Sequence, residues 1–495
     1  MRSARLWGTA AATALLAAAL LAWAVVTPGF RAPDEPNHVS AVIDLALEGE
    51  WAEPNTAPLD SGMRASYEWF GFPGVSKMFS DGGPVSAAML PPDAPSLAEL
   101  RGGPAPEIDA EQTNQITQHP PLYYAYLALW LHAFSLDEAP VTTMLLVLRL
   151  ASALLLLPIP ALLAWTATRI GLPPTAALIA AVVPAAWVQF THIGATVNNG
   201  ALLVLASTVF LAMLVRVVTG DLRMRIAVIA GAALAVALLT KGFALALAPL
   251  GPVAYLWRWR ADRARIWRPF IVAAAIALTG FSFYVYTLMQ YGTLATVSRA
   301  TEFTYTWDRF AGWTVAFVEE VSKSMWMNLG WLETPLRPSI LHYAVSIGAL
   351  ALIVYGSWLL RRSPGLVVIL NGAWVLTLIM FAIPSLRTWL WNETIRAAQG
   401  RYLQQAVLAL AILIAVALAR PRWISLAAPG VAAAAVVGGL WWGTRHFWVS
   451  EALFDPADAW PAGRIILGIA GILLMAGTAV ATGAALRLPY APLKT

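Results

Sequence analysis

The first apolar run of the chain, residues 6–27, reads LWGTAAATALLAAALLAWAVVT. A run of more than about 18 apolar residues is long enough to cross a bilayer as a helix. Arg2 and Arg5 precede it, as is typical of a cytoplasmic flank. A cleaved signal peptide is the alternative, because residues 22–24 (AWA) resemble a small-residue cleavage site, but the run is long for a signal. We therefore expect an anchored first helix, after which the chain emerges outside the cytoplasm.

Similar runs recur to the end of the chain. Of its 495 residues, 59% are hydrophobic and 12% are charged, whereas a soluble domain carries about 25% charged residues. Counting the first run, about twelve stretches have the length and hydropathy of spanning helices. The others cover residues 141–166, 174–191, 200–217, 226–240, 242–257, 269–289, 341–360, 364–385, 403–420, 424–443 and 463–486. The sequence predicts one all-α polytopic membrane domain over residues 1–495.

Lys and Arg residues in short loops set the orientation of such a protein. The basic clusters lie at residues 223–225, 257–268, 361–362, 420–422 and 487–494. When these loops are placed in the cytoplasm they alternate correctly with the helices, and both termini fall there as well. Nearly all acidic residues then lie outside, with Asp221 and Asp262 as the exceptions. We expect a multi-pass protein of a bacterial plasma membrane.

This alternation leaves residues 120–136 (PPLYYAYLALWLHAFSL) without a crossing. The segment is short and rich in Tyr, so we expect a helix lying in the outer interface. The alternative is a thirteenth span, which would invert everything after it. Three outer segments are then long, 28–140, 290–340 and 444–462, and the first is predicted to carry a short helix at 37–49.

Several kinds of function are excluded by what the sequence lacks. It has no Cys for disulfide or thiol chemistry. It has no nucleotide-binding loop, zinc motif or Ser-His-Asp arrangement, and its cytoplasmic loops are too short to form a domain. We expect membrane lipids, and no nucleic acid, among its partners.

The sharpest motif is Pro33-Asp34-Glu35-Pro36-Asn37-His38, directly after the first helix. Two adjacent carboxylates emerge here at the membrane surface, and the flanking prolines stiffen the chain. A carboxylate fixed there can accept a proton from an attacking hydroxyl or bind a metal. The ordinary alternative is that Asp34 or Asn37 caps the short helix that follows.

Other polar groups fall on the outer side by the same helix layout. They are His119 in QHPPLYY (118–124), Lys241 in TKG (240–242), Arg401 and Tyr402 in QGRY (399–402), and Asn198 with Asn199. Lys241 is costly between apolar runs unless it reaches water or an anion, and Arg401 could clamp a phosphate with its planar fork. The ordinary alternatives are an interfacial His, a snorkelling Lys, an Arg–Tyr anchor and a helix cap. Arg149, inside a span, needs a partner, for which we expect an outer-loop carboxylate.

The order of these motifs resembles the GT-C membrane glycosyltransferases. DEPNH follows the first helix, HPPLYY precedes the second, TKG lies between two later helices, and QGRYL lies near the C-terminal third. The likeness covers most of the chain and is closest to one bacterial membrane protein family of unassigned activity within that group. DEPNH, HPPLYY and QGRYL in this order are fairly specific, whereas TKG alone is weak.

The resemblance implies a GT-C-like bundle and an activity. A sugar, hexosyl or pentosyl, would pass from a polyprenyl-phosphate donor to a cell-envelope glycan, lipid or protein on the extracytoplasmic face, by an inverting displacement. Asp34, with Glu35 as the alternative, would be the base or a metal ligand. Lys241 and Arg401 would stabilise the departing phosphate.

The remaining substrate contacts implied by the resemblance are His38, His119, Tyr402, Asn198 and Asn199. Trp307, Trp313, Trp326 and Trp331 make the 290–340 loop a candidate sugar-stacking lid. Many relatives carry an acidic residue where this chain has Asn198-Asn199. That departure leaves the need for a divalent cation open.

Two other kinds of function compete with this interpretation. A transporter usually places ionisable groups and broken helices near the membrane midplane, whereas the predicted spans are almost free of charge. A non-catalytic envelope-assembly protein would tolerate the loss of Asp34.

Overall fold

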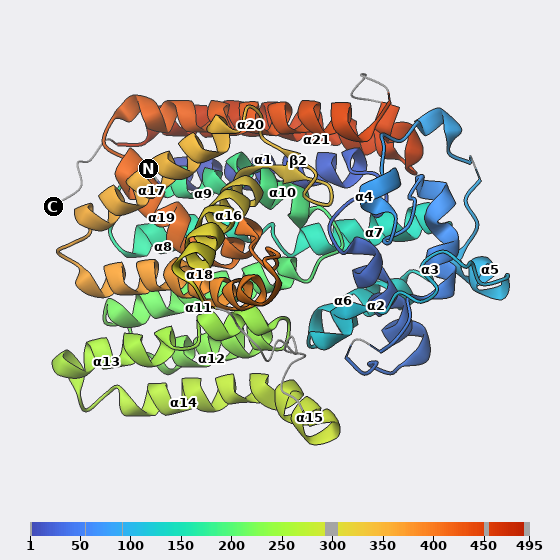
Figure 1. Ribbon diagram of the computed structural model, residues 1–495. Coiled ribbons are helices and arrows are strands. Elements are labelled where there is room, and N and C mark those ends of the chain that lie inside the picture. The colour runs from blue at the N-terminus through green and yellow to red at the C-terminus, as the bar shows by residue number, and fades with distance from the viewer. Residues whose placement is uncertain (1, 55, 92, 293–304, 450–454, 490–495) are drawn as a thin grey trace.

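The computed structural model describes residues 2–54, 56–91, 93–292, 305–449 and 455–489. Apart from one short hairpin, the regular structure of these residues is helical (Figure 1). The membrane part consists of α1 (Arg2–Val26), α7 (Val141–Leu154), α8 (Ile159–Arg169), α9 (Pro174–Ala186), α10 (Val188–Gly194), α11 (Gly200–Val218), α12 (Met224–Leu238), η4 (Gly242–Ala246), α13 (Leu250–Asp262), α14 (Trp267–Leu278), η5 (Thr279–Phe281), α15 (Ser282–Tyr291), α17 (Ile340–Leu359), α18 (Pro364–Asn392), η6 (Gly400–Ala406), α19 (Val407–Leu418), α20 (Arg422–Phe447) and α21 (Gly463–Arg487). The predicted all-α polytopic fold is confirmed.

The segments between the membrane helices carry shorter elements. The first long loop contains α2 (Glu35–Glu48), α3 (Ser61–Ala65), η1 (Ser66–Phe70), α4 (Met78–Asp81), η2 (Ala87–Met89), α5 (Leu97–Gly102), η3 (Gln115–Gln118) and α6 (Leu122–Ala133). Later come α16 (Trp307–Trp326), the hairpin of β1 (Asn328–Leu329) and β2 (Thr334–Pro335), and η7 (Asp455–Ala459). Residues 293–304 of the predicted lid and 450–454 of the last predicted outer segment lie outside the described residues.

Ten of the twelve predicted spans coincide with long apolar helical segments. Among the described residues, nine helices are long and apolar enough to cross a membrane, and the bent pair α9–α10 would make ten. The 61° bend follows Pro184 and an extended Trp187. Pro184 removes a helical N–H and crowds the preceding turn. The other two predicted spans correspond to the shorter apolar helix α12 and to η4 with α13.

Helix α1 lies inside the bundle. It packs against α21, α9, α20, α7 and α8, and the side chains of Leu15, Leu16 and Trp23 are fully buried. The first predicted span is thus part of the core of the bundle.

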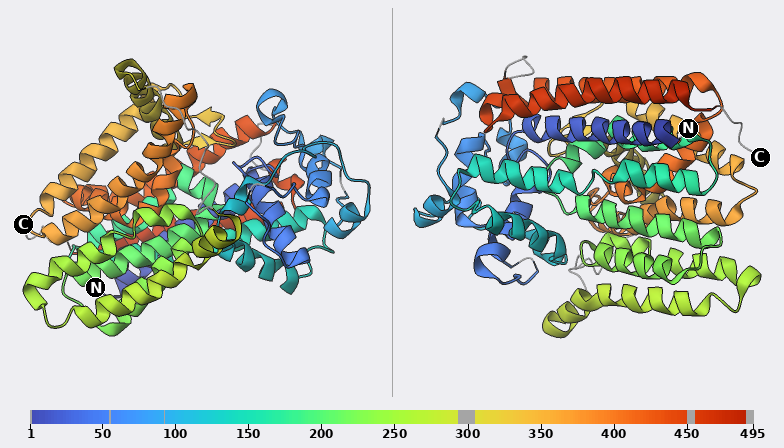
Figure 2. Two further views of the ribbon diagram at one scale, coloured as in Figure 1. Left: turned by 60° about the horizontal axis from the view of Figure 1, so that its bottom comes forward. Right: turned by 180° about the vertical axis from the view of Figure 1, so that it is seen from behind.

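The two ends of the bundle differ in the same way as the predicted sides of the membrane. The start of α1, the end of α21 and the turns α13–α14 and α17–α18 lie at one end, the terminal end (Figures 1 and 2). The first long loop covers the opposite end, the loop end. The basic clusters at residues 257–268 and 361–362 therefore lie at the terminal end. Helix α6 falls short of a spanning helix and packs against α2 at the loop end, in keeping with the predicted interfacial helix.

Candidate active site

Asp34 occupies the turn that starts α2, and its side chain does not cap the helix. Its backbone has φ 63°, in the left-handed region, and its carbonyl accepts the first helical hydrogen bond from His38 N. A non-glycine residue in this region is uncommon, and such strain often marks a functional site. The Asp34 carboxylate accepts hydrogen bonds from Gln115 Nε2 at 3.1 Å and Arg401 Nη2 at 3.3 Å. The capping alternative is thus wrong for Asp34.

Arg401 is held rigidly by the turn that carries it. Gly400 N donates to Ser324 Oγ of α16 at 2.7 Å, and a Cβ at Gly400 would lie 2.2 Å from the carbonyl oxygen of Val321. Only glycine allows this close approach. Arg401 Nε donates to Gln399 Oε1 at 2.5 Å. The Arg401 side chain is 7% exposed, and its Nη1 has no partner among the described residues, so one donor is left for a ligand.

Lys241 lies between α12 and η4, outside the spanning helices. Its Nζ donates to Asn199 Oδ1 at 3.1 Å and lies 5.5 Å from the Phe243 ring centre and 5.6 Å from that of Tyr402. Burial, and secondly the charge of Arg401, lower the pKa of Lys241 to about 8, whereas Asp34 raises it. The two cations therefore repel each other across a site that contains one nearby carboxylate.

A chain of polar contacts connects these groups to α2 and α6. His38 Nδ1 lies 2.9 Å from Tyr124 Oη, which accepts from Asn199 Nδ2 at 3.1 Å. His38 Nε2 lies 3.3 Å from Asn198 Nδ2. Burial, followed by the charge of Lys241, lowers the pKa of His38 and also that of His119 well below the usual value. Both histidines are therefore neutral at pH 7.

A cavity opens where these segments meet. It has a volume of about 30 Å³ and is lined by Ile193, Asn198, Gly200, Leu203, Val204, Lys241, Phe243, Arg401, Tyr402, Gln404 and Gln405. Gln404 Nε2 and Gln405 Oε1 are buried there and, in the described part of the chain, lack partners. Such atoms are costly unless a ligand or water satisfies them. The cavity suits a ligand that presents oxygen atoms to cations and amides.

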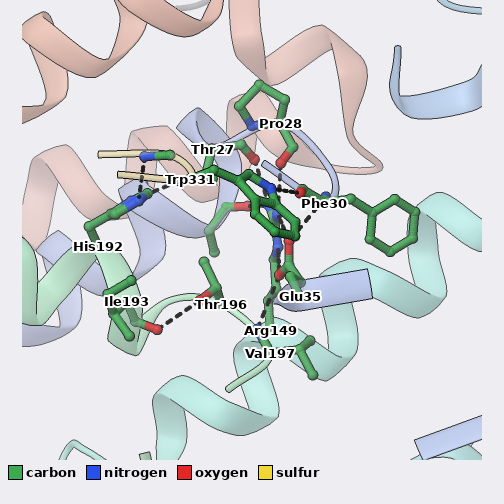
Figure 3. A network of polar contacts seen from close by, with 12 residues as sticks. Thr27, Pro28, Phe30, Glu35, Arg149, His192, Ile193, Thr196, Val197 and Trp331 are labelled. Carbon is green, nitrogen blue, oxygen red and sulfur yellow. Dashed lines mark hydrogen bonds and ion pairs between the residues drawn. The ribbon is translucent and has the colours of Figure 1, made fainter. Parts of the chain in front are cut away.

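Glu35 lies next to Asp34 in sequence but has a different environment (Figure 3). It is fully buried, and Arg149 binds it through two bonds, Nε to Oε1 at 2.8 Å and Nη2 to Oε2 at 2.6 Å. The backbone N–H groups of Phe30 and Val197 donate to the same carboxylate at 3.0 and 3.1 Å. Arg149 has the outer-loop partner that the sequence required. With four donors on its carboxylate, Glu35 is better placed to hold the loop than to accept a proton.

The same Arg149 ties α7 to the end of α1. Its Nη1 donates to the carbonyls of Ala24 and Thr27 at 2.9 and 2.6 Å, and its Nη2 to that of Pro28 at 2.8 Å. Two hydrogen bonds to the Glu35 carboxylate and three to backbone carbonyls, all buried, fix the start of the Asp34 segment.

The tryptophans proposed as a lid fall into two groups. Trp313 is buried, donates to Ser385 Oγ at 3.3 Å and packs on Phe317. Trp326 and Trp331 also donate to groups within the protein. Trp307 is 75% exposed and is therefore the one of these four indoles with an open face.

Sequence reasoning missed three polar residues of the site. Gln115 holds Asp34, and Gln404 and Gln405 line the cavity. The two adjacent amides at the start of an apolar run were a signal, because such groups are costly in a membrane helix unless they have a partner.

A divalent cation does not suit the donor set present here. Asn198 Oδ1 accepts from Gly200 N at 2.7 Å, and Asn199 Oδ1 accepts from Lys241. Asp34 is already bonded to Arg401, and two cationic side chains would repel a third cation. Within the described ranges, no group of three or more His, Asp or Glu side chains could hold a metal ion.

Comparison with known proteins gave one family and several distant structures. A family model described as "Predicted membrane protein (DUF2142)" matches residues 18–414. No curated protein matched the chain. ArnT from Cupriavidus metallidurans bound to undecaprenyl phosphate is 15% identical, with a TM-score of 0.48 over 95% of this chain and 76% of that one.

A second neighbour is the oligosaccharyltransferase of Archaeoglobus fulgidus tethered with an acceptor peptide. It is 16% identical, with a TM-score of 0.35 over 74% of this chain and 47% of that one. At these values the likenesses carry no argument about chemistry, which has to come from the residues of the site.

Proposed function

This chain belongs to the predicted membrane protein family DUF2142, and we propose that it is a glycosyltransferase that uses a polyprenyl-phosphate sugar. The observation that carries the proposal is that two cations, the half-buried Lys241 and the buried Arg401, line one cavity, and that Asp34 is the carboxylate bonded to Arg401. A phosphate in this cavity would relieve the repulsion between the cations and satisfy Arg401 Nη1. The GT-C resemblance of the four motifs supports the same substrate.

Asp34 is the proposed base. An acceptor hydroxyl would give its proton to the Asp34 carboxylate while its oxygen attacks the anomeric carbon. The bond between that carbon and the phosphate oxygen would break, and its electron pair would leave with the polyprenyl phosphate. Lys241 and Arg401 would stabilise the charge that grows on the leaving group, which is the kind of interaction that accelerates a reaction. Attack opposite the leaving group inverts the anomeric centre.

The remaining polar residues are proposed to orient the sugar and the cations. Asn199 fixes Lys241, and neutral His38 and His119 can hydrogen-bond sugar hydroxyls. Tyr402 lies under Arg401 and Lys241. Trp307 is the proposed stacking surface for the sugar, whereas Trp313 supports α16 from inside. The reaction would take place at the loop end, on the outer face of a bacterial plasma membrane, with both termini in the cytoplasm.

A transfer assay with purified protein tests the proposal. The protein would be supplied with radiolabelled polyprenyl-phosphate sugars and an extract of envelope acceptors. We expect label to enter the extract with the parent protein and not with Asp34→Asn. If the parent transfers no sugar from any hexosyl or pentosyl donor but moves a donor across the bilayer of proteoliposomes, the transporter alternative is correct.

A further inference from the structure

A second polar cavity lies at the loop end, where α20 ends beside the β1–β2 hairpin. It has a volume of about 350 Å³ and is lined by Glu333, Thr334, Pro335, Arg337, Trp441, Trp442, Arg445 and His446. None of these residues lines the first cavity. The first loop closes over this region, because Val85 forms backbone hydrogen bonds with Phe447 and Val449 at 2.7 and 3.0 Å.

The charge of the lining is positive. Its one carboxylate, Glu333, is bound by the buried Arg31 at 2.8 Å. Arg337 and Arg445 add two guanidinium groups at the exposed rim. Glu333 Oε1 also lies 3.6 Å from His446 Nε2, beyond a hydrogen bond. Among the lining residues, guanidinium groups therefore outnumber carboxylates.

The wall also carries aromatic rings and buried groups without partners. Trp442 Nε1 and Thr334 Oγ1 are buried and, within the described residues, have no hydrogen-bond partner. Trp441 is 46% exposed, and the Arg445 guanidinium lies 4.6 Å from its ring centre. Indole faces beside hydrogen-bond donors suit a sugar ring, whose C–H face is apolar and whose hydroxyls need partners.

We propose that this cavity binds an anionic sugar, one that bears a phosphate or a carboxylate. The guanidinium groups would bind the anion through planar paired hydrogen bonds. The indoles would contact the ring, and Trp442 Nε1 would donate to an oxygen of the sugar.

The position of the cavity indicates what the sugar is for. Glu333 joins the cavity wall to Arg31, and Arg31 Nη1 also donates to the carbonyl of Gly83 at 2.9 Å. Arg31 belongs to the same short segment as Asp34. The sugar would therefore be part of the acceptor, held next to the loop that carries the base. This last step rests on the proposed function, whereas the binding of an anionic sugar does not.

Binding can be measured without any transfer. The protein would be placed in nanodiscs of zwitterionic lipid, and saturation-transfer NMR would follow glucose 6-phosphate, glucuronic acid and neutral glucose. We expect both anionic sugars to bind more tightly than glucose. The double variant Arg337→Ala/Arg445→Ala should bind both anionic sugars about tenfold or more weakly, because hydrogen bonds to charged groups are lost. Trp442→Phe should weaken them less.

A matched control exists at the terminal end. The Arg361 guanidinium lies 4.1 Å from the Trp358 ring centre, and that of Arg445 lies 4.6 Å from the Trp441 ring centre. Arg361→Ala therefore removes a similar pair without touching the cavity. Equal binding by the parent and the double variant would overturn the proposal, as would equal binding of glucose. Loss of binding in Lys241→Ala instead of the double variant would place the sugar in the first cavity and also overturn it.

The lipid head group is a separate source of phosphate. If nanodiscs of phosphatidylglycerol abolish sugar binding by the parent, the cavity holds a lipid head group and the proposed acceptor sugar is wrong. If sugar binding survives there and in Asp34→Asn, the cavity is an anionic-sugar site. If the parent binds the sugar but transfers none, the proposed glycosyltransferase activity is wrong and the anionic-sugar site stands.

Discussion

Asp34 and Glu35 are neighbours in the chain, yet each belongs to a different kind of ion pair. Glu35 is fully buried, with two bonds to Arg149 and two to backbone N–H groups. Asp34 is 26% exposed, with one long contact to Arg401 and one to Gln115. The backbone turn at φ 63° separates them by pointing their side chains to different partners.

The difference shows which carboxylate can take part in a reaction. A buried carboxylate whose oxygens all accept strong hydrogen bonds is held in one place. A partly exposed carboxylate with weak contacts can exchange its partner for a substrate. The Glu35 pair therefore stabilises the loop, and the Asp34 pair is available for chemistry.

The largest expected effect comes from Asp34→Asn. This change keeps the shape of the side chain and removes its basicity, so transfer should fall by about 10²–10⁴-fold. The melting temperature should change little, because the carboxylate is not a cap and its pair is partly exposed. Initial transfer rates and thermal unfolding, measured on the same preparation, check both parts. A well-folded Asp34→Asn protein with near-parental transfer rules out Asp34 as the base.

Arg149→Leu should have its main effect on stability. Breaking a buried pair leaves a charge without a partner and costs about 3–5 kcal/mol. Thermal unfolding in detergent should show a marked loss for Arg149→Leu, and the double variant Glu35→Leu/Arg149→Leu should recover part of it. If Arg149→Leu is as stable as the parent, the Glu35–Arg149 pair does not stabilise the loop. The proposed difference between it and the Asp34–Arg401 pair is then wrong.

The sequence predicts the polytopic fold and many members of the site, because both depend on local patterns. Apolar runs reveal the helices, and the unmatched Arg149 calls for a carboxylate. The helix-capping alternative for Asp34 failed because the left-handed turn depends on the packed loop around it. The four tryptophans look alike in sequence, but packing against α18 and the Phe30 carbonyl separates Trp313 and Trp331 from exposed Trp307.

The long-range pairs could not be predicted in detail. Asp34 and Arg401 form an ion pair although most of the chain separates them in sequence. Arg31 and Glu333 form another pair over a similar separation. These contacts depend on how α16, η6 and the first loop pack together. Gly400 is an example. A side chain at this position is excluded only because α16 packs directly against the Gly400 backbone.

Arg401→Lys tests the Asp34–Arg401 pair by changing its cationic residue. Lys keeps the positive charge but lacks the planar guanidinium group and its Nη1, the N–H group without a partner. Binding of the polyprenyl-phosphate sugar should therefore weaken by about tenfold. Titration with a polyprenyl-phosphate sugar measures this. Arg309→Lys is a suitable control, because Arg309 pairs with Glu393 at 2.9 Å away from the cavity. Parental affinity in Arg401→Lys would mean that the fork does not hold the phosphate.

The smallest expected effect is a pH dependence of donor binding that comes from Lys241. Its pKa is lowered to about 8, first by burial and then by Arg401. The charged form predominates below that pH and binds phosphate, so affinity should fall as pH rises through this value. Between pH 7 and 8 the loss should be about twofold, and it should steepen above pH 8 as the neutral amine predominates. The phosphodiester of the donor keeps its charge over this range, so Lys241→Met should bind weakly at every pH with no such slope. An affinity for the polyprenyl-phosphate sugar that is flat up to pH 9.5 in the parent, or an equal slope in Lys241→Met, would show that Lys241 does not contact the phosphate as a cation.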